Sequence, residues 1–242
     1  NVFNLSSGTF SLVRGPIFTD LLLADEVNRA PAKTQSALLE AMEERRVTID
    51  GAAHPLTSTF TVFATQNPIE YEGTYPLPEA QLDRFLMKLH VGYPSDGEED
   101  AILRRFDAGF DSSNLAAAGL TAVATRDDLI RARAAIYGQP GQGGGVRTPD
   151  AVLAYIRRLT RATREHPSLS IGAGPRASIA LLLAAKARAA LEGRDFVTPD
   201  DVKSLARPVL GHRLVLDPEA EIDGLTAAEV LDGVTGEIEV PR

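Results

Sequence analysis

Two adjacent acids, Asp25 and Glu26, directly follow the apolar stretch Leu21–Ala24 in the sequence "LLLADE". The apolar stretch predicts a short buried strand. In a parallel sheet, ligands bind beyond the C-terminal ends of the strands, so acids placed there face a site and not the core. Such a pair can hold Mg2+ through water and orient a water molecule for attack on a phosphate. A strand that merely becomes polar at the solvent is the alternative, and the pair alone does not decide.

A second predicted strand, in "TFTVFATQNP", also ends in polar residues, Gln66 and Asn67. Neighbouring parallel strands with such ends would bring a carboxylate pair and an amide to one crevice. An amide there can orient a water molecule or contact a terminal phosphate. We therefore expect Asp25, Glu26 and Asn67 to converge.

Two arginines are further candidates. Arg176 lies in the first turn of an apolar helix predicted over 175–192, where a cation opposes the helix macrodipole at a cost of roughly 0.3–1 kcal/mol. A bound anion would offset that cost, so we interpret Arg176 as a phosphate ligand; a surface arginine is the alternative. For Arg84, in "QLDRF", the local sequence alone favours a salt bridge with Asp83 or Glu79.

The elements that position these residues divide the chain at about residue 92. Before it, apolar runs predict strands in "DLLLADE", "TFTVFATQNP" and "MKLHV", with a helix in "PAKTQSALLEAMEERR". Continuous apolar strands alternating with a helix indicate an α/β fold with a parallel sheet covered on both faces. Two hairpins are expected, one over 1–14 around Ser7-Gly8 and one over 46–57 around Asp50-Gly51.

Beyond the "GYPS" break the pattern becomes helical, and start signals such as "TRDD" and "VTPDD" support several helices. We predict helices over 97–107, 126–137, 149–165, 175–192 and 199–206, with a flexible loop or linker at "GQPGQGGG". Asn28 is expected to cap the helix that follows the acids.

Composition narrows the class of protein. The chain has 242 residues, 44% of them hydrophobic and none of them cysteine, so it can build two domains but neither disulfides nor thiolate metal sites. It shows no signal peptide and no apolar run near the roughly 18 residues of a membrane span, and we expect a cytoplasmic protein with no membrane contact.

Charge is unevenly distributed along the chain. The net charges of residues 1–100, 101–215 and 216–242 are −8, +7 and −7. The basic part is either a set of solvated helix faces or a module that meets phosphates or an acidic neighbour. Few aromatics accompany the arginines, which disfavours a nucleic-acid partner.

Three blocks, "LLLADEVNRAPAKTQSALLEAMEERRVTIDG", "FATQNPIEYEGTYPLPEAQLDRF" and "GAGPRA", closely resemble the MoxR branch of the AAA+ ATPases. The resemblance runs over nearly the whole chain. It implies the C-terminal part of an AAA+ α/β core over residues 1–92, with the two hairpins as inserts at 1–14 and 46–57. An all-α lid with a C-terminal tail would follow over 93–242.

The resemblance also implies roles for residues. Asp25 would bind Mg2+ through water, Glu26 would be the catalytic base and Asn67 would be sensor 1. Arg84 would be an arginine finger that reaches the next subunit, and Arg176 would be sensor 2, acting in cis or in trans. The implied cofactors are ATP and Mg2+.

The implied assembly is a homo-oligomeric hexameric ring with both hairpins facing its central pore. The implied purpose is chaperone-like remodelling of a client protein, or insertion of a metal cofactor into it, with a von Willebrand factor A domain protein as a possible partner.

The sequence departs from the family pattern at one point, because no G-x-x-x-x-G-K-[ST] phosphate loop occurs in the 242 residues. We expect that loop upstream of residue 1. Alternatives include a magnesium-chelatase ATPase subunit, a gas-vesicle ATPase, a replicative helicase subunit and a non-hydrolysing scaffold. The uncharged "NLSSGT" tip disfavours a DNA motor, and the presence of all five candidate side chains disfavours a scaffold.

Overall fold

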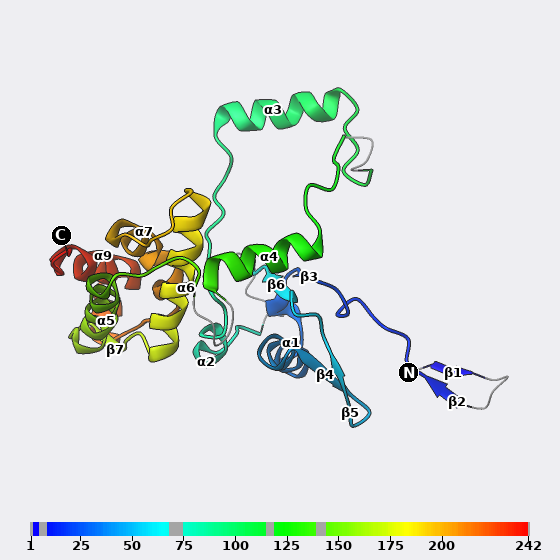
Figure 1. Ribbon diagram of the computed structural model, residues 1–242, viewed down its shortest axis with the longest axis horizontal. Helices are drawn as coiled ribbons and strands as arrows, with labels where there is room; N and C mark the ends of the chain where they lie inside the picture. The colour runs from blue at the N-terminus through cyan, green and yellow to red at the C-terminus, as the bar shows by residue number, and fades with distance from the viewer. Residues whose placement is uncertain (1, 5–8, 68–74, 115–118, 139–143, 242) are drawn as a thin grey trace.

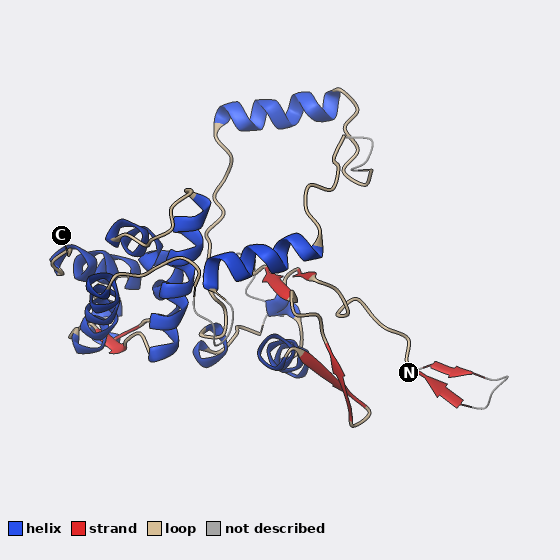
Figure 2. Cartoon of the chain, viewed as in Figure 1, coloured by secondary structure: helices blue, strands red, loops and turns tan. Residues whose placement is uncertain are grey.

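The computed structural model describes residues 2–4, 9–67, 75–114, 119–138 and 144–241. Figure 1 shows an α/β part from the first half of the chain beside a helical part from the second half, with one helix, α3, standing clear of both. Most strands lie in the α/β part (Figure 2). The α/β fold with a helical domain is therefore confirmed.

A βαβ unit forms the centre of the α/β part. β3 (Leu21–Ala24) and β6 (Thr61–Ala64) pair in parallel. The connection between them contains the 3-10 helix η1 (Val27–Arg29) and the helix α1 (Ala32–Glu44). The expectation of cover on both sheet faces is wrong for the described residues, because side chains alternate and Leu23 and Phe63 are 65% and 57% exposed.

Both predicted hairpins form. β4 (Arg46–Ile49) pairs with β5 (Ala52–Pro55) in antiparallel fashion. Their turn has Asp50 at φ 49° and Gly51 at φ 79°, the two left-handed positions of a type I′ turn. β1 (Val2–Asn4) also pairs antiparallel with β2 (Thr9–Ser11), and the predicted Ser7-Gly8 turn lies outside the described residues.

The third predicted strand, in "MKLHV", is wrong. After the short helix α2 (Glu79–Leu82), residues 87–91 form no strand. The backbone N–H of Lys88 donates instead to the carbonyl oxygen of Pro208 at 2.8 Å, and Met87 packs against the core of the helical part. Met87 therefore meets the helical part, whereas Leu89 and Val91 are 70% and 96% exposed.

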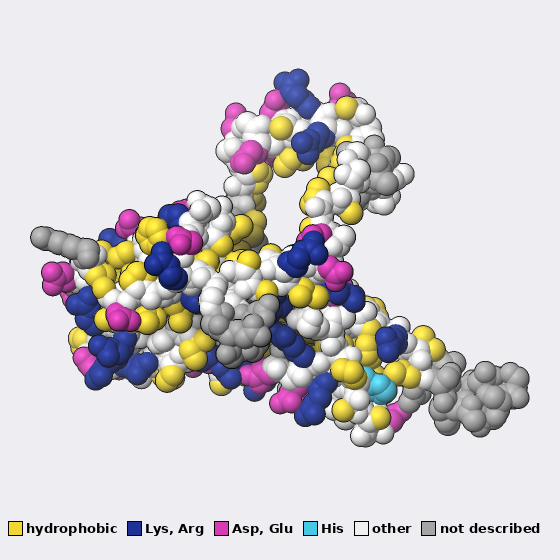
Figure 3. Space-filling view, viewed as in Figure 1, with side chains coloured by type: hydrophobic (Ala, Val, Ile, Leu, Met, Phe, Trp, Pro, Cys, Tyr) yellow, Lys and Arg dark blue, Asp and Glu magenta, His cyan; other side chains and the backbone are white. Residues whose placement is uncertain are grey.

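α3 (Asp96–Asp107) is a solvated helix. A capping box of Ser95 and Glu98 starts it, and it buries none of its residues. In Figure 3 it stands away from the body of the molecule with acidic, basic and hydrophobic side chains all visible on its surface. It therefore does not position any of the candidate functional residues predicted from the sequence.

α4 (Arg126–Tyr137) connects the two parts of the molecule. Its first residue, Arg126, donates to the carboxylate of Asp20 at 2.7 Å, and Arg133 donates to the carbonyl of Ser58 at 2.9 Å. α4 also contacts α6 in the helical part. The sequence-based boundary between residues 92 and 93 stays a prediction.

The helical part is built around one hydrophobic core. It contains α5 (Asp150–Glu165), α6 (Pro175–Leu191), α7 (Pro199–Leu210), the short α8 (Pro218–Ile222) and α9 (Ala227–Glu237). η2 (Gly211–Arg213) and the paired strands β7 (Leu169–Ile171) and β8 (Val215–Leu216) complete it. The largest fully buried side chains include those of Tyr155, Leu159, Leu181, Leu210 and Leu231. The helix predicted over 126–137 is confirmed at both ends, the other four predicted helices are confirmed with shifted ends, and α8 and α9 were not predicted.

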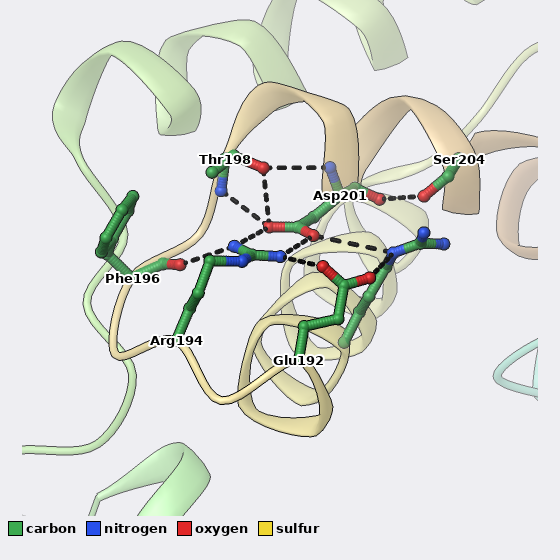
Figure 4. Close-up of polar contacts among 7 residues, drawn as sticks. Glu192, Arg194, Phe196, Thr198, Asp201 and Ser204 are labelled. Atoms are coloured by element: carbon green, nitrogen blue, oxygen red, sulfur yellow. Dashed lines mark hydrogen bonds and ion pairs between the residues drawn. The ribbon is translucent and has the colours of Figure 1, made fainter.

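An ion-pair network centred on the buried Asp201 joins the end of α6 to the start of α7 (Figure 4). Asp201 is 2% exposed and receives two hydrogen bonds from Arg194, at 2.8 and 2.6 Å. Thr198 caps α7 by accepting the backbone N–H of Asp201, and its own N–H and hydroxyl donate to the Asp201 carboxylate. Among the described helices, none is long and apolar enough to cross a membrane.

Candidate functional site

The two strand ends meet at Thr65, the residue after β6. Its hydroxyl donates to Asp25 Oδ1 at 2.5 Å and accepts the backbone N–H of Glu26 at 2.8 Å. Backbone hydrogen bonds from Thr65 to Ala24 and from Val27 to Thr65 continue the pairing beyond the strands. One hydroxyl therefore fixes both acids against the neighbouring strand.

Glu26 has an unusual backbone conformation, with φ 50° and ψ 49°. A non-glycine residue in this left-handed region costs on the order of 1–3 kcal/mol and persists only where its surroundings impose it. Here the hydrogen bond to Thr65 and the start of η1 impose it. The Glu26 carboxylate lies 3.1 Å from Arg29 Nε, with its side chain 38% exposed.

Asn67 follows β6 and is held by Asn28. The side-chain amide of Asn28 donates to the carbonyl oxygen of Asn67 at 3.4 Å. Asn28 is only 8% exposed, and its Oδ1 atom is buried without a hydrogen-bond partner among the described residues. The prediction that Asn28 caps α1 is wrong: Pro31 occupies the N-cap with no side-chain cap, because η1 turns Asn28 towards the end of β6.

Gln35 ties this region to the first half of α1. Its side-chain amide donates to the carbonyl oxygens of Val27 and Tyr75 at 3.2 and 2.9 Å, and it is 2% exposed. Sequence reasoning missed Gln35 and Thr65, since neither has a charge or a distinctive spacing.

Arg84 and Arg176 lie together at a different place. Both pair with the carboxylate of Glu43, Arg84 at 3.2 Å and Arg176 at 2.9 Å. Arg176 also lies 3.4 Å from Asp83. The local partners expected for Arg84, Asp83 or Glu79, are thus replaced by an acid in α1.

The segment that carries Arg84 is clamped by Arg213, a residue that sequence reasoning missed. The Arg213 side chain is 3% exposed and donates to Asp83 Oδ1 at 2.9 Å and to the carbonyl oxygens of Phe85 and Leu86 at 2.5 and 3.2 Å. Burial lowers the pKa of Arg213, while the hydrogen bond to Asp83 favours its charged form.

The turn before Arg176 is anchored on α5. Ala173 donates its N–H to the hydroxyl of Thr163 at 2.9 Å and accepts a hydrogen bond from Arg164 at 2.6 Å. A Cβ atom at Gly172 would lie 2.6 Å from the Arg164 backbone, so this close approach requires glycine. The "GAGPRA" motif therefore fixes where α6, and with it Arg176, begins.

The candidate residues thus form two clusters, related by α1. Gln35, near the start of the helix, donates to the carbonyl oxygen of Val27, the residue that follows the acids, and Glu43 pairs with both arginines in the last turn. Eight residues of α-helix separate these positions by about 12 Å along the axis. The structure brings Asp25 and Glu26 together at Thr65 and holds the Asn67 backbone through Asn28 at the end of the neighbouring strand. Separately, it brings Arg84 and Arg176 together at Glu43.

The first cluster suits a magnesium ion that also binds phosphate. Carboxylate, hydroxyl and amide oxygens are the hard ligands that Mg2+ prefers, and Mg2+ is usually held by one or two carboxylates plus substrate phosphates. Among the described residues, no group of three or more acidic, histidine or cysteine side chains could hold a metal ion. These residues fit the metal and a terminal phosphate, but the sequence supplies no glycine-lysine loop for the other phosphates.

Comparisons with known proteins agree with this architecture. Residues 1–87 match the model of the ATPase family associated with various cellular activities (AAA), and residues 161–234 match the AAA lid domain. The uncharacterized protein YeaC of Bacillus subtilis is 44% identical over 241 residues, 100% of this chain and 72% of that protein. Chaperone MoxR1 of Mycobacterium tuberculosis is 41% identical over 242 residues, 96% of this chain and 60% of that protein.

A solved structure of a proposed ATPase from Cytophaga hutchinsonii has a TM-score of 0.86 and 37% identity, covering 100% of this chain and 72% of that one. Magnesium-chelatase subunits also match, at 30% identity. An α/β core with acids at its strand ends, followed by a helical lid, is the architecture of the AAA+ class. Within that class, the chain belongs to the MoxR family of AAA+ ATPases.

Proposed function

We propose that the intact protein hydrolyses ATP in the presence of Mg2+ at the ends of β3 and β6. The observation that carries this proposal is the Thr65 hydroxyl, which holds Asp25 at 2.5 Å and the Glu26 backbone at 2.8 Å. Asp25 would hold the metal through water, and Glu26 would orient the attacking water and accept its proton. Asn67 would position the terminal phosphate. Bound Mg2+ would neutralise charge on the phosphates.

We assign Arg84 and Arg176 to the nucleotide of a neighbouring subunit. Their common partner Glu43 lies in the last turn of α1, whereas the acids of the same chain precede that helix. Such a shared site needs a ring or another repeating assembly, and a hexamer is the form we propose. The two hairpins would face its pore.

The Glu26→Gln variant of the full-length protein tests the assignment. The amide cannot accept a proton, so kcat should fall by about 100-fold or more, while ATP binding measured by calorimetry should persist. Glu44→Gln, an exposed acid paired with Arg46, is the matched control and should keep wild-type activity. Wild-type turnover by Glu26→Gln would remove Glu26 from the mechanism.

The name of the chaperone relative supports chaperone-like remodelling of a client protein as the purpose of hydrolysis. Insertion of a metal cofactor into a client is the other purpose that we propose from the resemblance. A full-length Glu26→Gln protein loaded with ATP should stay bound to its client, because release would require hydrolysis. Isolating that complex would identify the client and any von Willebrand factor A domain partner.

A further inference from the structure

Glu43 occupies a position that its own helix disfavours. It lies in the last turn of α1, where the negative end of the helix macrodipole repels an acid. Arg176 is also unfavourably placed, because it is a cation in the first turn of α6, at the positive end of that helix's macrodipole. The two side chains pair at 2.9 Å. Their placement is therefore explained by the pair and not by the stability of either helix.

Glu43 also holds two arginines with two separate oxygens. Oε1 contacts Arg176 Nη2 at 2.9 Å, and Oε2 contacts Arg84 Nη1 at 3.2 Å. Each guanidinium has five N–H donors, so one carboxylate oxygen engages only part of it. The Arg84 and Arg176 side chains are 33% and 54% exposed, which leaves both guanidinium groups open to an incoming anion.

The cluster retains positive charge despite its carboxylates. Arg84, Arg176 and Arg213 face Glu43 and Asp83, so three cations meet two anions. Arg213 is buried and directed at Asp83 and backbone carbonyls. The more exposed cations are the two that Glu43 holds side by side.

We propose that Glu43 is a positioning residue for ATP hydrolysis: it holds Arg84 and Arg176 as one preformed pair directed at the phosphates bound by a neighbouring copy. This inference rests on the proposed function. Free arginine side chains sample many rotamers, and ordering two of them at each encounter would cost entropy that a preformed pair avoids.

Glu43→Gln in the full-length protein, compared with Glu44→Gln, tests this inference. Glutamine keeps the shape and removes the charge. Glu44 is the next residue in the same turn and pairs with Arg46 at 3.0 Å. We expect kcat of Glu43→Gln to fall by about 10- to 100-fold, as for misplaced catalytic groups, with KM for ATP within about threefold of wild type. Glu44→Gln should match wild type in both.

Further variants separate positioning from a structural role. Glu43→Asp keeps the charge on a shorter side chain and should lose less kcat than Glu43→Gln. In an Arg84→Ala, Arg176→Ala background, Glu43→Gln should cost little more, since it acts through those arginines. The midpoint temperature of thermal unfolding of each variant should stay close to that of the wild-type protein.

The measured kcat values and unfolding temperatures distinguish a failure of the proposed ATP hydrolysis from a failure of the role assigned to Glu43. If wild-type protein does not hydrolyse ATP, the proposed function and this inference both fall. If wild type is active and Glu43→Gln and Glu43→Asp lose only thermal stability, or behave like Glu44→Gln, the inference alone is overturned. The inference is also overturned if Glu43→Gln lowers kcat in the Arg84→Ala, Arg176→Ala background by as much as it does in the wild-type protein.

Discussion

At the scale of single residues, Thr65 is the contact on which the acid pair depends. Thr65→Val keeps the shape but removes the hydroxyl that binds Asp25 and the Glu26 N–H. The left-handed conformation of Glu26 then loses a support, so we expect kcat of the full-length enzyme to fall by about 10- to 100-fold. Thr65→Ser retains the hydroxyl and is the matched control. Steady-state ATP hydrolysis by both variants checks this, and equal rates would show that the hydroxyl is dispensable.

The sequence predicted the acids and the amide but not their supports. Asp25 and Glu26 directly follow an apolar run, and Asn67 follows another after two polar residues, so the apolar runs alone place them at strand ends. Thr65 lies 40 residues from Asp25, and Glu43 lies 133 residues from Arg176. Pairings over such separations depend on how elements pack, which no local pattern encodes. The partner of Arg84 was predicted wrongly for the same reason.

At the scale of elements, Asp201 joins α6 to α7 in a pH-dependent way. Burial alone would raise the pKa of Asp201, but hydrogen bonds from Arg194 and Thr198 outweigh it and lower the pKa below the ordinary value of 3.8. Because the folded-state pKa lies below that of the unfolded chain, the stabilisation is complete above pH 3.8. It is lost as the pH falls through the folded-state value.

Asp201→Asn should therefore destabilise the helical part at neutral pH by about 3 kcal/mol, because it leaves buried groups without their ionised partner. The variant should also lose less stability than wild type on acidification below pH 4. Thermal unfolding followed by circular dichroism from about pH 7 to pH 3, a window set by the lowered pKa, measures both effects. Asp200→Asn, in the same turn, is the control; parallel pH profiles for Asp201→Asn and wild type would contradict the assignment.

Elements whose sequence signals lie within a few residues were predicted correctly, whereas an element that depends on a distant partner was not. α4 and α7 begin at capping boxes that are visible in "TRDD" and "VTPDD", and such signals act within one turn. α9 has the same box at Thr226 and Glu229, so it could have been found. The strand predicted in "MKLHV" failed because a strand needs a neighbour, and Lys88 instead bonds to Pro208 of α7.

At the scale of the whole molecule, α1 separates the two clusters of candidate residues, which the proposed function makes two half-sites. The acids lie near its start, and the arginine pair lies at its end. The pair also joins the core to the lid, because Glu43 belongs to α1 and Arg176 to α6. A neighbour that binds nucleotide against this pair would therefore contact both parts of the chain, which gives lid orientation a direct link to assembly.

Mixing inactive subunits tests whether the two half-sites come from different copies. Glu26→Gln subunits keep Arg84, and Arg84→Ala subunits keep Glu26, so a site between them can combine both intact groups. In a closed ring with head-to-tail interfaces, equal amounts should restore about a quarter of the sites, measured as ATP hydrolysis against each variant alone. A mixture of Glu26→Gln with the double variant Glu26→Gln, Arg84→Ala contains no intact site and should stay inactive. If the first mixture is as inactive as the second, Arg84 acts on the nucleotide of its own chain, and the proposal that Glu43 positions Arg84 for a neighbour's phosphates is overturned.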